Sequence, residues 1–344
     1  MASFPERLSF LLNGSCVAFA LSLAKDTGIL QALIDAKEGL TSEQIAREKN
    51  LKERYVREIL ASLGTAEFLH IATNEAGTLS YFLEDDEKKA LSSALTAFIS
   101  FPKVFGHIYD QVRACVPADG PFGVRYSERV HDVIDEFTKY LVDGFTDSIL
   151  KHTDGLQRRL ETGIDVIEFG SGRGRLLSKF ATMFPNSTFT VSEILPELLD
   201  TIRARWSHIP NIKYELVDLC SLPDVVTKQY DWLFCCDVIH DLPNPFKAVE
   251  GIQKLVKAPD GVFTFIDMAT SGSPVVDRGS IEVAAYYAAG TFLCIPESFQ
   301  RPDSLALGPC WGQQKAVEIA TLAGFKVKDV KLESGHQAIY ICTL

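Results

Sequence analysis

The stretch EFGSGRG, Glu168 to Gly174, decides how the second half of this chain folds. An apolar run over residues 164–169 leads into it, and a helical pattern over residues 176–184 follows it. A buried strand, a glycine-rich turn and a helix in this order build a nucleotide pocket in α/β proteins. Glycines keep side chains away from the backbone, so a ligand can contact the turn directly. The three glycines are Gly170, Gly172 and Gly174.

The glycine spacing and the neighbouring acids indicate which cofactor the turn binds. A dinucleotide fingerprint has its third glycine at position 175, where this chain has Arg175, so a nicotinamide dinucleotide is disfavoured. The carboxylate of Glu168 would repel a diphosphate and attract a sulfonium cation. A second apolar strand, expected over residues 188–192, ends in Glu193, which is placed to accept both hydroxyls of a ribose. Together these features favour S-adenosylmethionine.

Two more strands, expected over residues 213–217 and 230–236, are each followed by an acid, Asp218 and Asp237. Open α/β sheets bind ligands at the carboxyl ends of their strands. From about residue 160 onward the chain resembles class I S-adenosylmethionine-dependent methyltransferases. The resemblance implies an α/β fold with a Rossmann-like seven-stranded sheet, and S-adenosylhomocysteine as the product. The cofactor-binding residues that it implies are Glu168, Gly170, Gly172, Gly174, Glu193, Ile194, Asp218, Leu219, Cys236 and Asp237.

The segment CDVIHDLPNP, residues 236–245, suggests how the acceptor is activated. Plant-type small-molecule O-methyltransferases carry a His-Asp pair just after this strand, and the histidine removes the acceptor's proton. His240 and Asp241 are similar in place and type. An unperturbed imidazole titrates near neutral pH, as a general base must. The resemblance therefore implies that His240 and Asp241 are catalytic, with a capping or packing role as the structural alternative for His240.

The N-terminal region shows the order of elements of a winged helix, which can indicate DNA binding. Residues 1–90, however, contain 10 Lys and Arg against 14 Asp and Glu, whereas a phosphate-binding face needs a basic excess. Similar methyltransferases use such a domain for dimerisation, so the resemblance implies a homodimer. The expected elements are helices over 42–49 and 53–63, with Thr41 as N-cap of the first, and a hairpin of strands over 68–72 and 78–83.

An uncharged apolar stretch, Leu8 to Ala24, imitates the core of a signal sequence. Glu6 precedes it, the segment 13–15 (Asn-Gly-Ser) interrupts it, and its seventeen residues are short for a membrane span. We therefore expect a buried helix that crosses into a partner subunit, and a cytoplasmic protein. A net charge of −11 argues against nucleic acid and anionic membranes as partners.

Length and residue usage indicate an intracellular enzyme of more than one domain. The 344 residues include eight cysteines without a CxxC pair, which fits reduced thiols. Neither HExxH nor a similar cluster occurs, so we expect no catalytic metal. The expected domains are a winged-helix dimerisation domain over residues 1–90, a helical linker contributing to the active site over 91–160, and an S-adenosylmethionine-binding domain over 161–344.

The segments that select the acceptor are expected to flank the cofactor domain. GVRYS, residues 123–127, is similar to an element of bacterial and animal winged-helix methyltransferases, and residues 279–294 and 308–314 correspond to a lid in the resembled enzymes. Core packing or partial exposure is the alternative for the aromatic residues among them. Residues 324–344 are expected to form a closing hairpin around 333–336. The candidate substrate residues are Tyr126, Tyr287, Cys294 and Trp311.

The sequence thus predicts methyl transfer to the oxygen or sulfur of a small-molecule acceptor. Two alternatives from other classes remain open. One is a transcriptional regulator with a methyltransferase fold, and the other is a cofactor-binding scaffold without catalysis.

Overall fold

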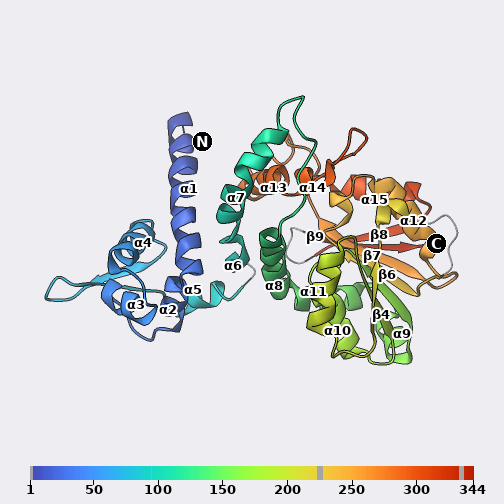
Figure 1. Cartoon of the computed structure of the whole chain (residues 1–344), viewed down its shortest axis with the longest axis horizontal. Helices are drawn as coiled ribbons and strands as arrows, with labels where there is room; N and C mark the ends of the chain where they lie inside the picture. The colour runs from blue at the N-terminus through green and yellow to red at the C-terminus, as the bar shows by residue number, and fades with distance from the viewer. Residues whose placement is uncertain (1–2, 94, 223–227, 333–336) are drawn as a thin grey trace. The chain divides into compact units, whose positions relative to one another are not determined.

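The computed structural model describes residues 3–93, 95–222, 228–332 and 337–344. The chain divides into two compact units, Met1–His107 and Ile108–Leu344, whose elements are labelled in Figure 1. The turn expected at 333–336 lies outside the described residues.

The N-terminal unit has the predicted winged-helix order of helix, helix and hairpin. Thr41 caps the first of these helices, since its Oγ1 accepts a hydrogen bond from the Gln44 amide at 3.2 Å. The Gln44 side chain in turn accepts from the Thr41 amide at 2.7 Å, which completes a capping box. The elements are α1 (Phe4–Asp26), α2 (Ile29–Asp35), α3 (Ser42–Glu48), α4 (Glu53–Thr65), β1 (His70–Thr73), antiparallel β2 (Leu79–Phe82), α5 (Asp85–Ala90) and α6 (Leu95–Phe98).

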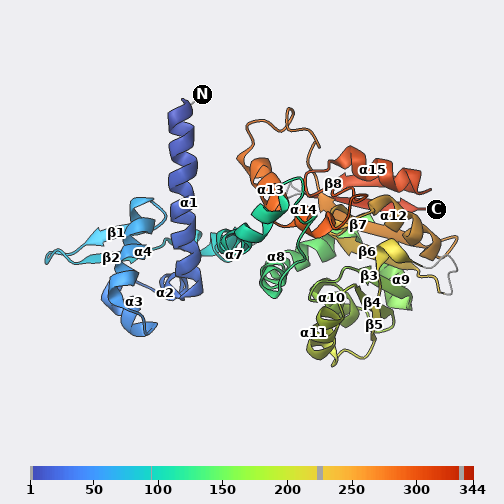
Figure 2. The ribbon, with the colours of Figure 1, turned by 45° about the horizontal axis from the view of Figure 1, so that its top comes forward.

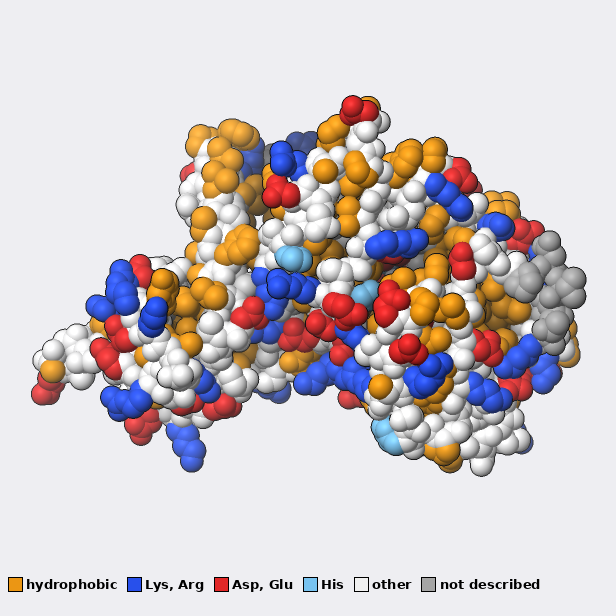
Figure 3. Space-filling model, in the orientation of Figure 1, with side chains coloured by type: hydrophobic (Ala, Val, Ile, Leu, Met, Phe, Trp, Pro, Cys, Tyr) orange, Lys and Arg blue, Asp and Glu red, His pale blue; other side chains and the backbone are white. Residues whose placement is uncertain are grey.

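Helix α1 is longer than the apolar stretch from which it was predicted. It continues without a break through residues 13–15, and at 23 residues it is long and apolar enough to cross a membrane. It is also largely exposed in the single chain: only 11% of its most apolar window is buried, and Phe10 is 70% exposed. Figure 3 shows apolar side chains gathered along this helix. The expected helix is therefore present and longer than the seventeen-residue apolar stretch, and its burial against a partner subunit stays a prediction.

The second unit is built on a seven-stranded sheet in the order β5-β4-β3-β6-β7-β9-β8. Strands β5, β4, β3, β6 and β7 are parallel, and β9 runs antiparallel to β7 and β8. The expected closing hairpin is thus present, with β9 inserted inside the sheet. The strands are β3 (Asp165–Phe169), β4 (Thr188–Glu193), β5 (Ile212–Leu216), β6 (Trp232–Cys236), β7 (Val262–Met268), β8 (Lys326–Lys331) and β9 (Gln337–Thr343).

Helices cover both faces of this sheet, as Figures 1 and 2 show. Side chains of α8 to α11 pack on one face, and those of α12 and α15 pack on the other. The helical segments are α7 (Phe101–Cys115), which begins in the first unit, α8 (Glu128–His152), α9 (Leu156–Thr162), α10 (Arg175–Met183), α11 (Pro196–Trp206), η1 (Leu219–Ser221), η2 (Ile239–Asp241), α12 (Pro245–Leu255), α13 (Ile281–Phe292), α14 (Cys294–Ser298) and α15 (Gln313–Leu322).

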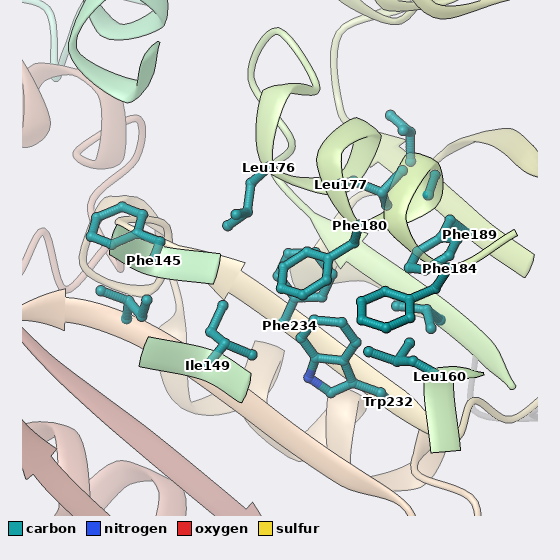
Figure 4. Packing of buried hydrophobic residues seen from close by; sticks show 14 of the residues in the cluster. Phe145, Ile149, Leu160, Leu176, Leu177, Phe180, Phe184, Phe189, Trp232 and Phe234 are labelled. Carbon is teal, nitrogen blue, oxygen red and sulfur yellow. The ribbon is translucent and has the colours of Figure 1, made fainter. Parts of the chain in front are cut away.

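Strand β6 contributes side chains to the hydrophobic clusters on both faces of the sheet. Successive strand residues point to opposite faces, so Trp232 and Phe234 pack against Phe180 of α10, while Leu233 and Cys235 face the α12 and α15 side. Figure 4 shows the first of these clusters. Because both faces are buried, the strand is apolar throughout, and polar residues follow only where it ends. The functional side chains therefore gather at the carboxyl ends of the strands.

Candidate active site

The glycine turn between β3 and α10 leaves its backbone accessible. Gly172 has φ of +58°, and the position where a Cβ would stand is open space. Its amide donates a hydrogen bond of 2.6 Å to Oε1 of Glu193, at the end of β4. Gly170 and Gly174 also have positive φ, and Gly174 is the N-cap residue of α10. The turn thus has the shape that the glycine pattern predicts.

Two buried carboxylates flank this turn. Glu168 is 4% exposed, and its Oε2 has no hydrogen-bond partner within the described residues. Burial raises the pKa of Glu168 to about 8. Burial likewise raises the pKa of Glu193 to about 7, against the opposing effect of the Gly172 amide. Desolvated carboxylates that lack a cation favour a positively charged ligand, since such a ligand would stabilise their ionised forms.

The next predicted cofactor residues lie at the ends of β4 and β5. Ile194 follows Glu193 and is 43% exposed. Asp218 stands two residues beyond β5, and its Oδ1 accepts a hydrogen bond of 2.8 Å from the Cys220 amide. This contact caps the short helix that contains Leu219, which is buried. Asp218 thus has a structural role in the isolated chain, and its role in cofactor binding stays a prediction.

Asp237 directly follows β6 in an unusual backbone conformation, with φ of +51°. Its Oδ2 accepts a hydrogen bond of 3.0 Å from Nε2 of Gln337 on β9, and its Oδ1 is buried. Burial, and then the charge of Asp267, raise the pKa of Asp237 to about 7. The preceding Cys236 packs toward the opposite face of the sheet from Cys235.

His240 is buried in η2 between two carboxylates. Its Nδ1 lies 2.7 Å from Oδ1 of Asp267, at the end of β7, and its Nε2 lies 3.3 Å from Oδ1 of Asp241. Burial lowers the pKa of His240, but the two carboxylates outweigh it and hold the pKa well above its usual value. Asp267 is fully buried, and its Oδ1 also accepts from Nε1 of Trp311 at 3.0 Å. Trp311 therefore contacts the site through its N–H as well as packing in the core.

Tyr126 connects this cluster to the segment before α8. Its hydroxyl donates a hydrogen bond of 2.8 Å to Oδ2 of Asp241. Its amide donates one of 2.6 Å to Oε2 of Glu297 on α14, whose other oxygen lies 2.7 Å from Nη1 of Arg125. Cys294 begins α14 and is 9% exposed; its sulfur and the ligand atoms of His240 and Asp241 lie within 4.8 Å of one another.

The structure thus brings three of the four candidate substrate residues around His240. Burial, and then the charges of Cys310 and Asp277, raise the pKa of Tyr287. The neighbouring Tyr286 interacts electrostatically with Asp237 of the site. A role for Tyr287 stays a prediction. Sequence reasoning missed three residues of the site, Asp267, Glu297 and Gln337. Asp267 had a usable signal, because it is another acid at the end of an apolar strand.

Comparison with known protein families identifies one domain in each of the two compact units. Residues 15–93 match the family described as "Rv2258c-like winged HTH domain", and residues 167–263 match the family described as "Methyltransferase domain". The chain carries a methyltransferase domain. A curated relative, the non-reducing polyketide synthase mapC of Penicillium roqueforti (strain FM164), is 26% identical over 137 residues. This match covers 38% of the chain but only 5% of the synthase.

Solved structures confirm the fold of the methyltransferase domain and of the winged helix. Human N-acetylserotonin methyltransferase, solved in complex with SAM, matches with a TM-score of 0.67 and 17% identity over 99% of this chain and 98% of its own. An O-methyltransferase family protein from Burkholderia thailandensis matches with a TM-score of 0.71 and 13% identity, over 100% of this chain and 98% of its own. A protein described as a pericyclic reaction enzyme matches with a TM-score of 0.64 and 12% identity, over 100% of this chain and 90% of its own. The predicted class I architecture with an N-terminal winged helix is therefore confirmed.

Proposed function

We propose that this protein transfers the methyl group of S-adenosylmethionine to an oxygen or sulfur atom of a small-molecule acceptor, with His240 as general base. The contact between His240 Nδ1 and Asp267 carries this proposal. A carboxylate at Nδ1 fixes the tautomer and orientation of an imidazole. Because the two carboxylates also hold the pKa of His240 well above its usual value, Nε2 takes the acceptor's proton only when His240 is deprotonated, so kcat should rise with pH. Nε2 points toward Asp241, at the end of η2, where Tyr126 and Cys294 also converge.

The residues of the glycine turn fit the cofactor. S-adenosylmethionine would supply an activated methyl group on a sulfonium cation. Glu168 and Glu193 would offset its charge and hold its ribose, and Gly172 leaves room for its close approach. The solved human methyltransferase was crystallised with this cofactor. The chain's own contribution to rate is then alignment, exclusion of water and removal of the acceptor proton.

The direct test incubates the purified protein with isotopically labelled cofactor and a library of phenols, alcohols, thiols and amines, and identifies methylated products by mass. We expect products among the hydroxyl and thiol compounds. His240→Ala is expected to lower kcat on the order of 100-fold or more while cofactor affinity changes little. The exposed His208→Ala serves as control. Near-normal kcat in His240→Ala, turnover only of amines, or products without an added methyl group would each refute the proposal.

The winged-helix unit is proposed to mediate homodimerisation rather than DNA binding, in a cytoplasmic protein. The exposed apolar side chains of α1 form a surface that a second copy would bury. On α4, which corresponds to the recognition helix of DNA-binding relatives of this fold, Arg54 and Arg57 are paired with Glu58 and Glu53 at 2.7 and 2.9 Å. Their charges are therefore compensated, which supports the dimerisation role over a regulatory one.

A further inference from the structure

The cluster at His240 contains three kinds of ligand atom in one small volume. The imidazole nitrogen of His240, a carboxylate oxygen of Asp241 and the sulfur of Cys294 all lie within 4.8 Å of one another. We propose that these three residues form a binding site for a single Zn²⁺ ion, which inhibits the enzyme by occupying the nitrogen needed for acceptor deprotonation. Metal binding itself is independent of the function proposed above, and only the inhibition rests on it.

The surroundings of His240 match those of a metal-ligating histidine. Such residues almost always donate their second ring N–H to a carboxylate, a backbone carbonyl or a water, which orients the ring and directs the other nitrogen at the ion. Here Asp267 accepts from Nδ1 at 2.7 Å, and Asp267 is itself held by Trp311 Nε1 at 3.0 Å and by the Met268 amide at 2.8 Å. Nε2 is consequently the nitrogen that faces Asp241.

Asp241 is oriented in the same way. The hydroxyl of Tyr126 holds Oδ2 at 2.8 Å, which leaves Oδ1 3.3 Å from Nε2 of His240. Oδ1 is buried and has no hydrogen-bond partner within the described residues. A buried carboxylate oxygen without such a partner, next to an imidazole nitrogen, is an available ligand for a cation.

Cys294 supplies the third ligand from a separate element. It is a free thiol at the first position of α14, and Glu297 fixes this helix through hydrogen bonds to the Tyr126 amide and to Arg125. On binding, the thiol of Cys294 and Nε2 of His240 would each release a proton to solvent, so that sulfur ligates as thiolate and the imidazole as its neutral form. Nitrogen, oxygen and sulfur ligands together favour Zn²⁺, whereas Mg²⁺ and Ca²⁺ prefer oxygen alone.

The charge and exposure of the cluster also suit a cation. Asp237, Asp241 and Asp267 act electrostatically on one another within it, and Glu297 acts on Asp241. The side chain of Asp241 is 18% exposed while that of His240 is 4% exposed, so an ion would enter past Asp241. Three protein ligands leave a fourth tetrahedral position for water, which is the arrangement of an accessible rather than a closed zinc site.

Metal binding is tested first with cofactor-free protein by calorimetric titration with Zn²⁺. We expect one strong site, at least a tenfold weaker affinity in Cys294→Ala and in Asp241→Asn, and no comparable site for Mg²⁺. Cys310→Ala, which removes a neighbouring buried thiol outside the ligand set, is the matched control and should retain wild-type affinity. Co²⁺ provides a direct readout of the wild type: sulfur ligation adds a near-ultraviolet charge-transfer band, which Cys294→Ala should lose.

Inhibition is tested separately with whichever acceptor proves active. Zn²⁺ should inhibit the wild type and Cys310→Ala at concentrations near the calorimetric Kd, and a chelator should restore activity. Unchanged Zn²⁺ affinity in both Cys294→Ala and Asp241→Asn, or loss of the strong site on replacing the exposed Cys16 by Ser, would overturn the proposal. A missing methyl transfer activity would refute the proposed function but leave the binding result intact.

Discussion

The buried acids at the glycine turn predict that the cofactor-free protein loses stability as pH rises from 6 to 8. The folded pKa of Glu168, about 8, exceeds the ordinary value of 4.5, so between these values the folded state binds more protons than the unfolded state. Stability therefore falls as pH rises through this window. With these pKa values, linkage gives a loss of about 2 kcal/mol from Glu168 between pH 6 and 8. Glu193, with a folded pKa of about 7, adds about 1 kcal/mol in the same direction.

The assay is thermal unfolding of cofactor-free protein at pH 6, 7 and 8, followed by circular dichroism. The combined loss of about 3 kcal/mol corresponds to a fall in Tm of about 6–12 °C for a domain of this size. Glu168→Gln has no charge to desolvate, so its Tm should fall less over this range. Glu318→Gln, on the exposed face of α15, is the matched control. Because a sulfonium cation stabilises ionised carboxylates, the Tm increase caused by S-adenosylmethionine should grow with pH more than that caused by S-adenosylhomocysteine.

The result that refutes this reasoning is an equal fall in Tm with pH in wild type and Glu168→Gln. Such a result would mean that Glu168 titrates near its ordinary pKa and contributes no pH-dependent cost.

Two further predictions concern other parts of the chain. Trp311→Phe removes the N–H that donates to Asp267, so we expect a loss of about 2 kcal/mol of unfolding free energy by chemical denaturation and a lower kcat; unchanged values for both would show that this hydrogen bond does not support the site. Replacing Phe10 and Leu11 by Asp places charges on the exposed face of α1, so light scattering should report a monomer where the wild type is a dimer; a monomeric wild type, or a dimeric variant, would contradict dimerisation through α1.

The cofactor edge of the sheet was predictable because parallel strands align their carboxyl ends. An acid directly after an apolar run, such as Glu193 or Asp237, is therefore expected at this edge of the sheet. The pairing of His240 with Asp267 was not predictable in the same way. These residues are 27 positions apart, and they meet because β7 lies beside β6, a neighbour relation that spacing alone does not specify.

Local signals were incomplete where several weak effects compete. Asn13, Gly14 and Ser15 are poor helix formers, yet together they disfavour helix by only about 1–2 kcal/mol relative to alanine, and α1 runs through them as a longer helix than the apolar stretch indicates. Asp218 follows a strand, as a ligand-binding acid would, but its carboxylate also caps η1, so its part in cofactor binding stays a prediction. An acid at a strand end can serve the local backbone as readily as a ligand, and only the side-chain contact distinguishes the two uses.

The insertion of β9 between β7 and β8 sets an order of events during synthesis. Gln337, which hydrogen-bonds Asp237 at the cofactor edge, belongs to the strand that is synthesised after all the other strands of this sheet. Until β9 has been synthesised and has paired, β7 and β8 each have an unpaired edge, and Asp237 lacks this hydrogen bond.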